Sequence, residues 1–488
     1  MTVGSAALPR RASRSAFSAA AIAGSVAVIS LGAGRLVAEP NTARLVLSGC
    51  AVVLVVGLAV VRPTGLLAGT VIWLAMLGVI RRLLVNAAPV GSLDPLLLVG
   101  PAALVLLALL GLHRRSRHTT RLSQAVAVLA GLMLLGVLNP LQGSIRAGFA
   151  GLLFVFIPML GFWIGRGLCG DRALKWLLGL VAVVSALTAV YGLWQSLRYF
   201  PWWDRRWIET VNLDALSVNG VTRPFSVFSS ASEYGAYLSI GIVLVVTAAL
   251  KRPLFRLLSL GAVPLLAVAL GYESSRGVVF LTVLALGVVF AAWKRLPLAF
   301  AAAAGVGLLF LLPIAVRSVA PSSFGSNSTG TLVAHQVQGL ASPFNSNAST
   351  GGIHLTEVIG GLKSAITNPI GYGVSTVTIA GSKFGGLAHG TEADPSNVSV
   401  ALGLPGLLAY IAVVGYGFTR LYRLASDRGD LLSLAALALL AVTFMQWLNG
   451  GQYAVAFLPW LVMGWADARP DDQAAAPAPR HIQRLLER

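Results

Sequence analysis

Charged residues are scarce in this chain of 488 residues. Only 11% of the residues are charged, 56% are hydrophobic, and the mean hydropathy is +0.80. Soluble globular domains carry about 25% charged residues. The composition therefore excludes an ordinary soluble fold and predicts an all-α polytopic membrane protein.

Cysteine and metal-binding patterns are also nearly absent. The chain has two cysteines, Cys50 and Cys169, and both lie in or beside apolar runs. They form neither a metal-ligand pattern nor a disulfide framework. No DxD-type pair of carboxylates occurs, so we expect no bound metal and no other cofactor.

The scarce charges are strongly biased in sign. Lys and Arg together number 36 against 17 Asp and Glu, which gives a formal net charge of +19. In a soluble protein this excess would suggest nucleic acid as a partner. In a membrane protein it reflects the positive-inside rule and an anionic ligand, so we expect a lipid bilayer and no nucleic acid.

Long apolar runs occupy most of the chain. Their lengths predict about 14 transmembrane helices, with about 12 as the lower bound if some pairs are re-entrant. The expected spans are residues 16–38, 43–61, 65–80, 94–112, 122–138, 147–165, 173–193, 232–250, 257–271, 276–293, 297–316, 399–419, 431–448 and 452–467.

The short loops predict the orientation of these spans. With an N-terminus in the cytoplasm, every strong basic cluster except Arg81–Arg82 falls on the cytoplasmic side. The expected organisation is a cytoplasmic N-terminus, eleven helices interrupted by an outer aromatic loop, a large extracytoplasmic loop, three more helices, and a disordered cytoplasmic tail. The corresponding ranges are 1–15, 16–316 with the loop at 194–230, 317–398, 399–467 and 468–488.

Two charges stand at the mouth of the span that begins GYESSRGVVFLTVLALGVVF (271–290). Glu273 and Arg276 both fall on the outer side, and Ser274 or Ser275 would suit the N-cap of the helix. An arginine in the first turn is locally unfavourable, but a bound anion would reverse this because the helix start and the guanidinium would both face it. The alternative is an interfacial arginine that snorkels and pairs with Glu273.

Other cations also fall on the outer side, against the positive-inside bias. Arg146 begins a span, Arg206 lies in the aromatic loop, and Arg223 precedes the eighth span. A diphosphate headgroup would account for this concentration of positive charge. Glu233, in contrast, follows Ser230 at the spacing of a capping box, which favours a structural role.

The large outer loop carries its own signals. Residues 351–373 place Leu355, Ile359 and Ile366 on one helical face, which predicts an amphipathic helix lying on the membrane and ending at Asn368-Pro369. His354 and Glu357 lie in the first turn of this helix. His389, Glu392 and Asp394 crowd together before the next span, so any of these five residues is a candidate base.

Four segments, in this order, resemble the O-antigen ligase/O-antigen polymerase family of bacterial membrane glycosyltransferases. They are RPFSVFSSASEYGAYL, the SRG start of a span, the surface helix ending NPIGYG, and the H…N…GLPG start of the next span, and the likeness covers about residues 140–420. The resemblance implies a metal-independent GT-C-like enzyme in the bacterial cytoplasmic membrane. Such an enzyme transfers a glycan from an undecaprenyl-diphosphate-like carrier to an acceptor hydroxyl on the outer face.

The resemblance also implies roles for particular residues. Arg276 matches the arginine that holds the diphosphate, and His389 matches the histidine that activates the acceptor. Family members often have a second arginine where this chain has His354, so the resemblance favours a polymerase over a ligase, with Arg223 as the compensating cation. Partners in the same pathway would be a flippase and a chain-length regulator.

A transporter or flippase is the competing interpretation from another class. It predicts charged residues near the middle of the spans. Apart from Arg35, the expected spans carry almost none.

Overall fold

The computed structural model describes residues 40–84, 94–113, 119–211, 216–321, 323–345, 351–391 and 393–469. Most of these residues are helical, and ten helices are long and apolar enough to cross a membrane. The chain is therefore an all-α polytopic membrane protein, as the composition predicts. The first expected span (16–38) and most of the expected tail (468–488) lie outside the described residues.

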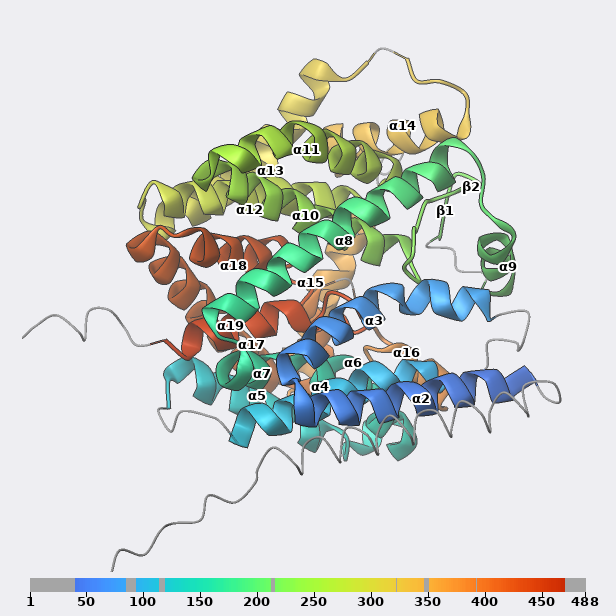
Figure 1. Cartoon of the computed structure of the whole chain (residues 1–488), viewed down its shortest axis with the longest axis vertical. Helices are drawn as coiled ribbons and strands as arrows, with labels where there is room; N and C mark the ends of the chain where they lie inside the picture. The colour runs from blue at the N-terminus through green and yellow to red at the C-terminus, as the bar shows by residue number, and fades with distance from the viewer. Residues whose placement is uncertain are drawn as a thin grey trace, which may run out of the picture.

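The first group of helices forms the lower part of the bundle in Figure 1 and ends with the long helix α8 that crosses it. Residues 147–165, expected as one span, lie within the single candidate span Ile145–Leu168, in which a turn at Leu160 separates two helices. The elements are α2 (Pro40–Val61), α3 (Pro63–Leu83), α4 (Leu96–His113), α5 (Arg121–Gly136), η1 (Pro140–Gln142), α6 (Ile145–Met159), α7 (Gly161–Leu168) and α8 (Asp171–Leu197).

The expected aromatic loop at 194–230 has structure of its own. It contains a short helix and a two-stranded antiparallel hairpin in which Ser217 pairs with Thr222. The helices that follow form the upper part of the bundle in Figure 1. The elements are α9 (Trp202–Val211), β1 (Ser217–Val218), β2 (Val221–Thr222), α10 (Ala231–Lys251), α11 (Pro253–Glu273), α12 (Arg276–Trp293) and α13 (Leu298–Val319).

The segment expected as a large loop, 317–398, is mostly folded. It contains α14 (Ser328–Ala341), α15 (Gly351–Thr367) and α16 (Ile379–Lys383). The predicted amphipathic helix is confirmed as α15, which ends one residue before Asn368-Pro369. Gly361 and Ala365 are its buried residues, whereas Leu355, Ile359 and Ile366 are exposed. An apolar face that the protein leaves uncovered suits a helix lying on a membrane.

The C-terminal part departs from the expected three spans. The long helix α17 (Asp394–Arg428) begins earlier than expected and bends at Gly403, whose φ is 63°. A Cβ at Gly403 would lie 2.0 Å from the carbonyl oxygen of Pro369, so only glycine allows this close approach.

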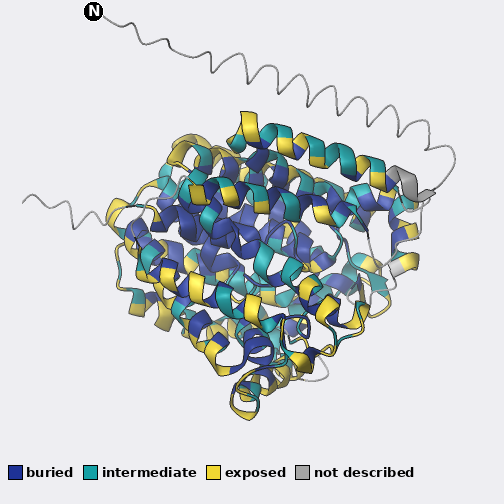
Figure 2. Ribbon diagram, turned by 90° about the horizontal axis from the view of Figure 1, so that it is seen from below, coloured by how far each residue is buried: buried dark blue, intermediate teal, exposed yellow. Residues whose placement is uncertain are grey.

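The helices found at the last two expected spans, 431–448 and 452–467, are shorter than predicted. The helices found there are α18 (Leu431–Val442) and α19 (Phe457–Asp467), with 12 and 11 residues. Each is shorter than the roughly 20 residues that a full span needs, and turns occupy 443–456 between them. Both helices are buried almost completely inside the bundle, in the dark blue interior of Figure 2.

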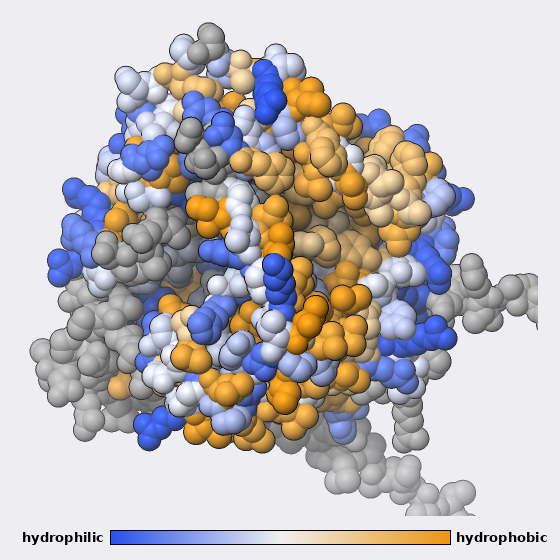
Figure 3. All heavy atoms as spheres, turned by 180° about the vertical axis from the view of Figure 1, so that it is seen from behind, coloured by the Kyte–Doolittle hydropathy of each residue, from blue (hydrophilic) through white to orange (hydrophobic). Residues whose placement is uncertain are grey.

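One end of the bundle gathers the irregular elements. At this end, called the site end below, α8 and α11 finish, α10 and α12 begin, and α9, the hairpin and α14 lie to the right in Figure 1. In Figure 3 apolar residues spread over the middle of one face, and hydrophilic residues are more frequent toward its left and right margins. This distribution fits a bundle embedded between two aqueous boundaries.

Candidate functional site

The turn between α11 and α12 forms the centre of the candidate site. Ser274 ends α11 in a left-handed conformation, and its hydroxyl donates to the carbonyl oxygen of Leu332 on α14 at 3.0 Å. Ser275 occupies the N-cap position of α12, but its side chain makes no capping hydrogen bond. A serine therefore stands at the N-cap as expected, but without the capping hydrogen bond, and the other candidate, Ser274, faces α14.

A buried carboxylate fixes the position of one arginine at this turn. Glu273 is completely buried, and Oε1 accepts a hydrogen bond from Nη2 of Arg223. Nε of Arg223 also donates to the carbonyl oxygen of Glu273 at 2.8 Å. The carboxylate lies directly on α10, since a Cβ at Gly235 would lie 2.5 Å from Oε2. Arg223 is thereby held at the mouth of α12 by two charge-assisted contacts.

Helix α14 covers the second arginine. Nη2 of Arg276 lies 3.0 Å from Nδ1 of His335. The guanidinium rests on the backbone of Gly339, where an added Cβ would lie 2.0 Å from Nε of Arg276. The side-chain amide of Gln336 donates to the carbonyl oxygen of Ser275 at 3.3 Å. Three residues of α14, which together span about one helical turn, therefore contact the start of α12.

The electrostatics of this group favour an anion. Burial, together with the charges of Arg276 and Arg223, lowers the pKa of His335 to about 4. At neutral pH the histidine is therefore uncharged, and the one carboxylate of the group, Glu273, pairs with Arg223. Arg223, Arg276 and His335 are only partly buried, so solutes can approach them. We call Arg223, Glu273, Arg276 and His335 the two-arginine cluster.

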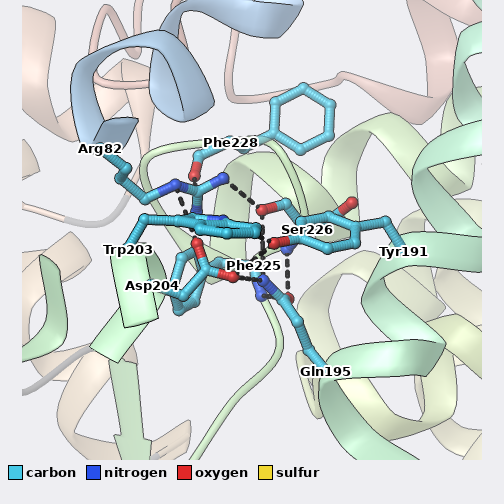
Figure 4. A network of polar contacts seen from close by, with 8 residues as sticks. All are labelled: Arg82, Tyr191, Gln195, Trp203, Asp204, Phe225, Ser226 and Phe228. Atoms are coloured by element: carbon cyan, nitrogen blue, oxygen red, sulfur yellow. Dashed lines mark hydrogen bonds and ion pairs between the residues drawn. The ribbon is translucent and has the colours of Figure 1, made fainter. Parts of the chain in front are cut away.

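A separate buried network holds the segment that carries Arg223. The completely buried Arg82, at the end of α3, donates to the carbonyl oxygens of Ser226 at 2.6 Å and Phe228 at 3.1 Å (Figure 4). Its Nε lies 3.1 Å from Oδ1 of Asp204 on α9. Arg82 thus joins α3, α9 and the chain that follows Arg223 at one point.

Asp204 and Gln195 complete this network. Oδ2 of Asp204 accepts hydrogen bonds from the Tyr191 hydroxyl and the Gln195 amide, both at 2.7 Å (Figure 4). Oε1 of Gln195 accepts from the backbone N–H groups of Phe225 and Ser226, at 3.1 and 2.7 Å. A buried network with these partners fixes one backbone conformation for the segment after Arg223.

The same region explains the basic pair that broke the expected charge pattern. Arg82 pairs with Asp204, and Nε of Arg81 lies 2.8 Å from Oδ2 of the buried Asp94. Each arginine of the pair therefore lies against a buried carboxylate, although Asp94 is shared with Arg44, whose Nη1 lies 3.8 Å from Oδ2. These contacts give both arginines a structural role inside the bundle.

Two other predicted cations lie apart from the cluster. Arg146, the second residue of α6, is exposed. Arg206, on α9, is also exposed and lies 3.9 Å from Glu209, one helical turn away. A solvated pair of this kind contributes little binding energy, so the structure gives neither residue a formed anion site.

The predicted bases are spread over two elements. His354 and Glu357 form an exposed pair on α15, with 3.9 Å between Nδ1 and Oε2. His389 is exposed, its backbone N–H donates to the carbonyl oxygen of Thr376 at 2.7 Å, and its ring centroid lies 6.0 Å from that of Tyr372. Glu392 lies outside the described residues.

Asp394 has a structural role in place of the expected catalytic one. Its carboxylate is buried and accepts hydrogen bonds from the backbone N–H groups of Trp447 and Leu448 and from the Tyr410 hydroxyl, at 2.6, 3.2 and 3.0 Å. Donors therefore occupy both oxygens, and the residue fixes the turns between α18 and α19 to the start of α17.

Glu233 likewise has the structural role that its sequence pattern predicts. Its backbone N–H donates to the Ser230 hydroxyl at 3.3 Å, which is one half of a capping box. Its buried carboxylate accepts from the backbone N–H of Ala454 at 2.8 Å.

His335 and Gly339 were not predicted from the sequence. The helix that carries them has a weak local signal: Asn327 caps it by accepting from the N–H of Gly330 at 2.8 Å, and Leu332, Gln336 and Gly339 are buried at helical spacing. This pattern could have indicated a helix with one buried face. It could not have indicated that the face meets Arg276, 59 residues away in sequence from His335.

Comparison with known proteins adds no assignment. No protein-family model matches the chain, and a search of curated proteins finds no match. Among the residues that the structure describes, no three His, Cys, Asp or Glu side chains are grouped closely enough to hold a metal ion.

Proposed function

We propose that this protein is a glycosyltransferase that moves a glycan from a polyprenyl-diphosphate carrier to an acceptor sugar hydroxyl, and that it polymerises the repeat units of a surface polysaccharide. The observation that carries this proposal is the two-arginine cluster at the start of α12. The reaction it supports needs no metal, because arginines supply the charge stabilisation that a metal would otherwise provide.

The chemistry of the bond to be broken requires such a cluster. When the sugar–diphosphate bond breaks, the electron pair of that bond moves to the departing diphosphate, which gains negative charge. Arg223 and Arg276 are positioned before the reaction begins and can stabilise this charge. The first turn of α12 lacks a side-chain cap, so its backbone N–H groups can contribute as well.

The acceptor hydroxyl needs a base that can take its proton. We assign this role to His389, which is exposed and whose backbone is held by Thr376. The His354–Glu357 pair and Glu392 are the alternatives. Asp394 is no longer a candidate, because backbone donors occupy its carboxylate.

The orientation that we propose places the site end on the outer face of the bacterial cytoplasmic membrane. The opposite end carries basic residues at the helix ends, among them Lys251, Lys294 and Arg428, as the positive-inside rule requires of a cytoplasmic face. The proposal keeps a GT-C-like arrangement of about 14 passes with both termini inside. Although α18 and α19 are short, together they bring the chain back to the end of the bundle at which α17 finishes.

The position of the buried charges favours an enzyme over a transporter. Arg82, Glu233 and Glu273 are completely or almost completely buried, and each lies within the first or last turn of its helix. A transporter would be expected to carry such groups near the middle of its spans. These three groups lie instead at one boundary of the bundle, the site end.

The experiment that tests the proposal uses purified protein in nanodiscs with an undecaprenyl-diphosphate-linked oligosaccharide. Product length and released undecaprenyl diphosphate are measured for wild type, Arg276→Ala and the control Arg205→Ala, which replaces an exposed arginine of α9. We expect longer glycans from wild type and from Arg205→Ala, and loss of both products in Arg276→Ala.

Other outcomes separate the alternatives. If wild type releases the carrier only when a different acceptor is added, the protein is a ligase. If wild type leaves every donor intact but, reconstituted in sealed vesicles, moves it across the bilayer, the protein is a transporter and the proposal is wrong.

A further inference from the structure

Helix α14 brings one titratable side chain to the two-arginine cluster. His335 is the only ionisable residue of α14, and Arg276 is the only one of α12. The histidine ring lies against the guanidinium of Arg276 and is partly buried. No sequence pattern indicates a role for this histidine, and the transfer reaction proposed above does not require it.

The charged groups around His335 can be stated for each packed element. Arg276 of α12 and Arg223, which follows β2, both act on it electrostatically. On α11, Glu273 is engaged by Arg223, and Tyr272 is the adjacent titratable residue.

The remaining two elements packed on α14 contribute no charge at the histidine. On α13, Arg317 contacts the far end of α14 at the carbonyl oxygen of Ala341. On α8, the half that ends at the site end carries no charged residue, and the Tyr191 hydroxyl donates to Asp204.

This arrangement keeps the histidine neutral while the site holds no anion. Two guanidiniums oppose a third positive charge, and a neutral ring nitrogen can accept an N–H from Arg276. A diphosphate seated on Arg276 and Arg223 would bring at least two negative charges to the same place. The guanidinium N–H groups would then turn to the phosphate oxygens, and protonation would turn the accepting ring nitrogen into a second, charge-assisted donor.

We propose that His335 is a third ligand of the diphosphate and that it takes up one proton from solution when the anion binds. The inference rests on the proposed function, since it concerns the same site, and it adds a group that recognises the charge of the ligand. Binding and protonation are linked, so each favours the other by the same factor. Affinity for the diphosphate should therefore rise as the pH falls.

The test measures the dissociation constant of undecaprenyl diphosphate for the full chain in nanodiscs from about pH 5.5 to about pH 8. Wild type is compared with His335→Gln and with His113→Gln, the latter replacing the exposed histidine at the end of α4. The diphosphate also titrates in this range, but all three proteins share that contribution. We expect wild type and His113→Gln to gain roughly tenfold more affinity than His335→Gln across this range.

A calorimetric measurement makes the test independent of how His335→Gln folds. The binding enthalpy of wild type in two buffers of different ionisation enthalpy gives the number of protons taken up, which we expect to exceed the contribution of the ligand itself. Inorganic diphosphate is the second probe. If both probes cause the same proton uptake, the diphosphate group alone is enough to couple binding to protonation. If only the lipid causes proton uptake, the coupling requires the membrane-bound carrier.

Failure of this inference and failure of the proposed function give different results. If wild type binds the lipid and His335→Gln has the same pH dependence, or if wild type takes up no proton, His335 is not a ligand and only this inference is overturned. If wild type binds neither probe at any pH, the proposed function fails and this inference fails with it.

Discussion

The contact between Arg276 and Gly339 allows a substitution that separates function from stability. In Gly339→Ala the new Cβ would lie 2.0 Å from Nε and 2.3 Å from Cζ of Arg276, so the guanidinium must leave its position. The arginine side chain is flexible, and alanine is favoured over glycine in a helix by up to about 1 kcal/mol. We therefore expect the free energy of unfolding to change by less than about 1 kcal/mol.

The expected loss of function is much larger. A hydrogen bond to a charged group contributes about 1.5–3 kcal/mol. Loss of one such bond between Arg276 and the diphosphate would lower kcat/KM for the lipid-linked donor roughly 10- to 150-fold.

Turnover and unfolding are measured on the same nanodisc samples for wild type, Gly339→Ala and Gly352→Ala. The last is the control, because a Cβ at Gly352 of α15 meets no atom within 4 Å. If Gly339→Ala is folded and turns over donor at the wild-type rate, the position of Arg276 is irrelevant to the reaction and our reasoning is refuted.

Three further predictions concern stability. Arg82→Ala leaves Asp204 buried without its guanidinium and should lower the free energy of unfolding by about 3–5 kcal/mol in a denaturant titration; a loss below about 1 kcal/mol would contradict the buried ion pair. Asp394→Ala leaves the N–H groups of Trp447 and Leu448 without their acceptor and should cost about 1–3 kcal/mol in the same titration, whereas no loss would mean that the turns are held otherwise. With no anion bound, His335 has a pKa of about 4 in the folded protein and of about 6.5 in the unfolded chain. Between these two pH values the unfolded state binds more protons than the folded state. Wild type should therefore lose stability as the pH falls from about 6.5 to about 4. His335→Gln should lose less over the same range, and identical pH profiles would exclude a buried neutral histidine.

Some features of the fold could be predicted because local sequence determines them. The apolar periodicity of residues 351–366 and the proline at 369 are enough to place α15 and its end, and the structure confirms both. Arg276 could likewise be placed at a helix mouth, because the long apolar run after it fixes where α12 begins.

Other features depend on contacts between distant residues. Length and hydropathy predict two spans in 431–467, but the turns at 443–456 shorten both. Asn449-Gly450-Gly451 is a local turn signal within this range. The reason for the turn is tertiary, since a Cβ at Gly450 would lie 2.0 Å from the carbonyl oxygen of Phe154.

The candidate site shows the same division. The sequence indicates that Arg223 and Arg276 are out of place for a positive-inside protein, and the structure brings both to Glu273 and His335. The sequence alone cannot distinguish a carboxylate that is held by backbone donors from one that is available for chemistry. Asp394 is of the first kind, and only its contacts with Trp447 and Leu448 reveal this.

The central claim is that Arg276 holds the diphosphate of a lipid-linked donor. The most direct test is the rate at which nanodisc-embedded protein releases undecaprenyl diphosphate from a labelled donor, for wild type and for Arg276→Ala. We predict release by wild type and at least a tenfold slower release by the variant, since the variant loses at least one hydrogen bond to the charged diphosphate. Equal rates in the two proteins would show that Arg276 is only an interfacial anchor and would contradict the account.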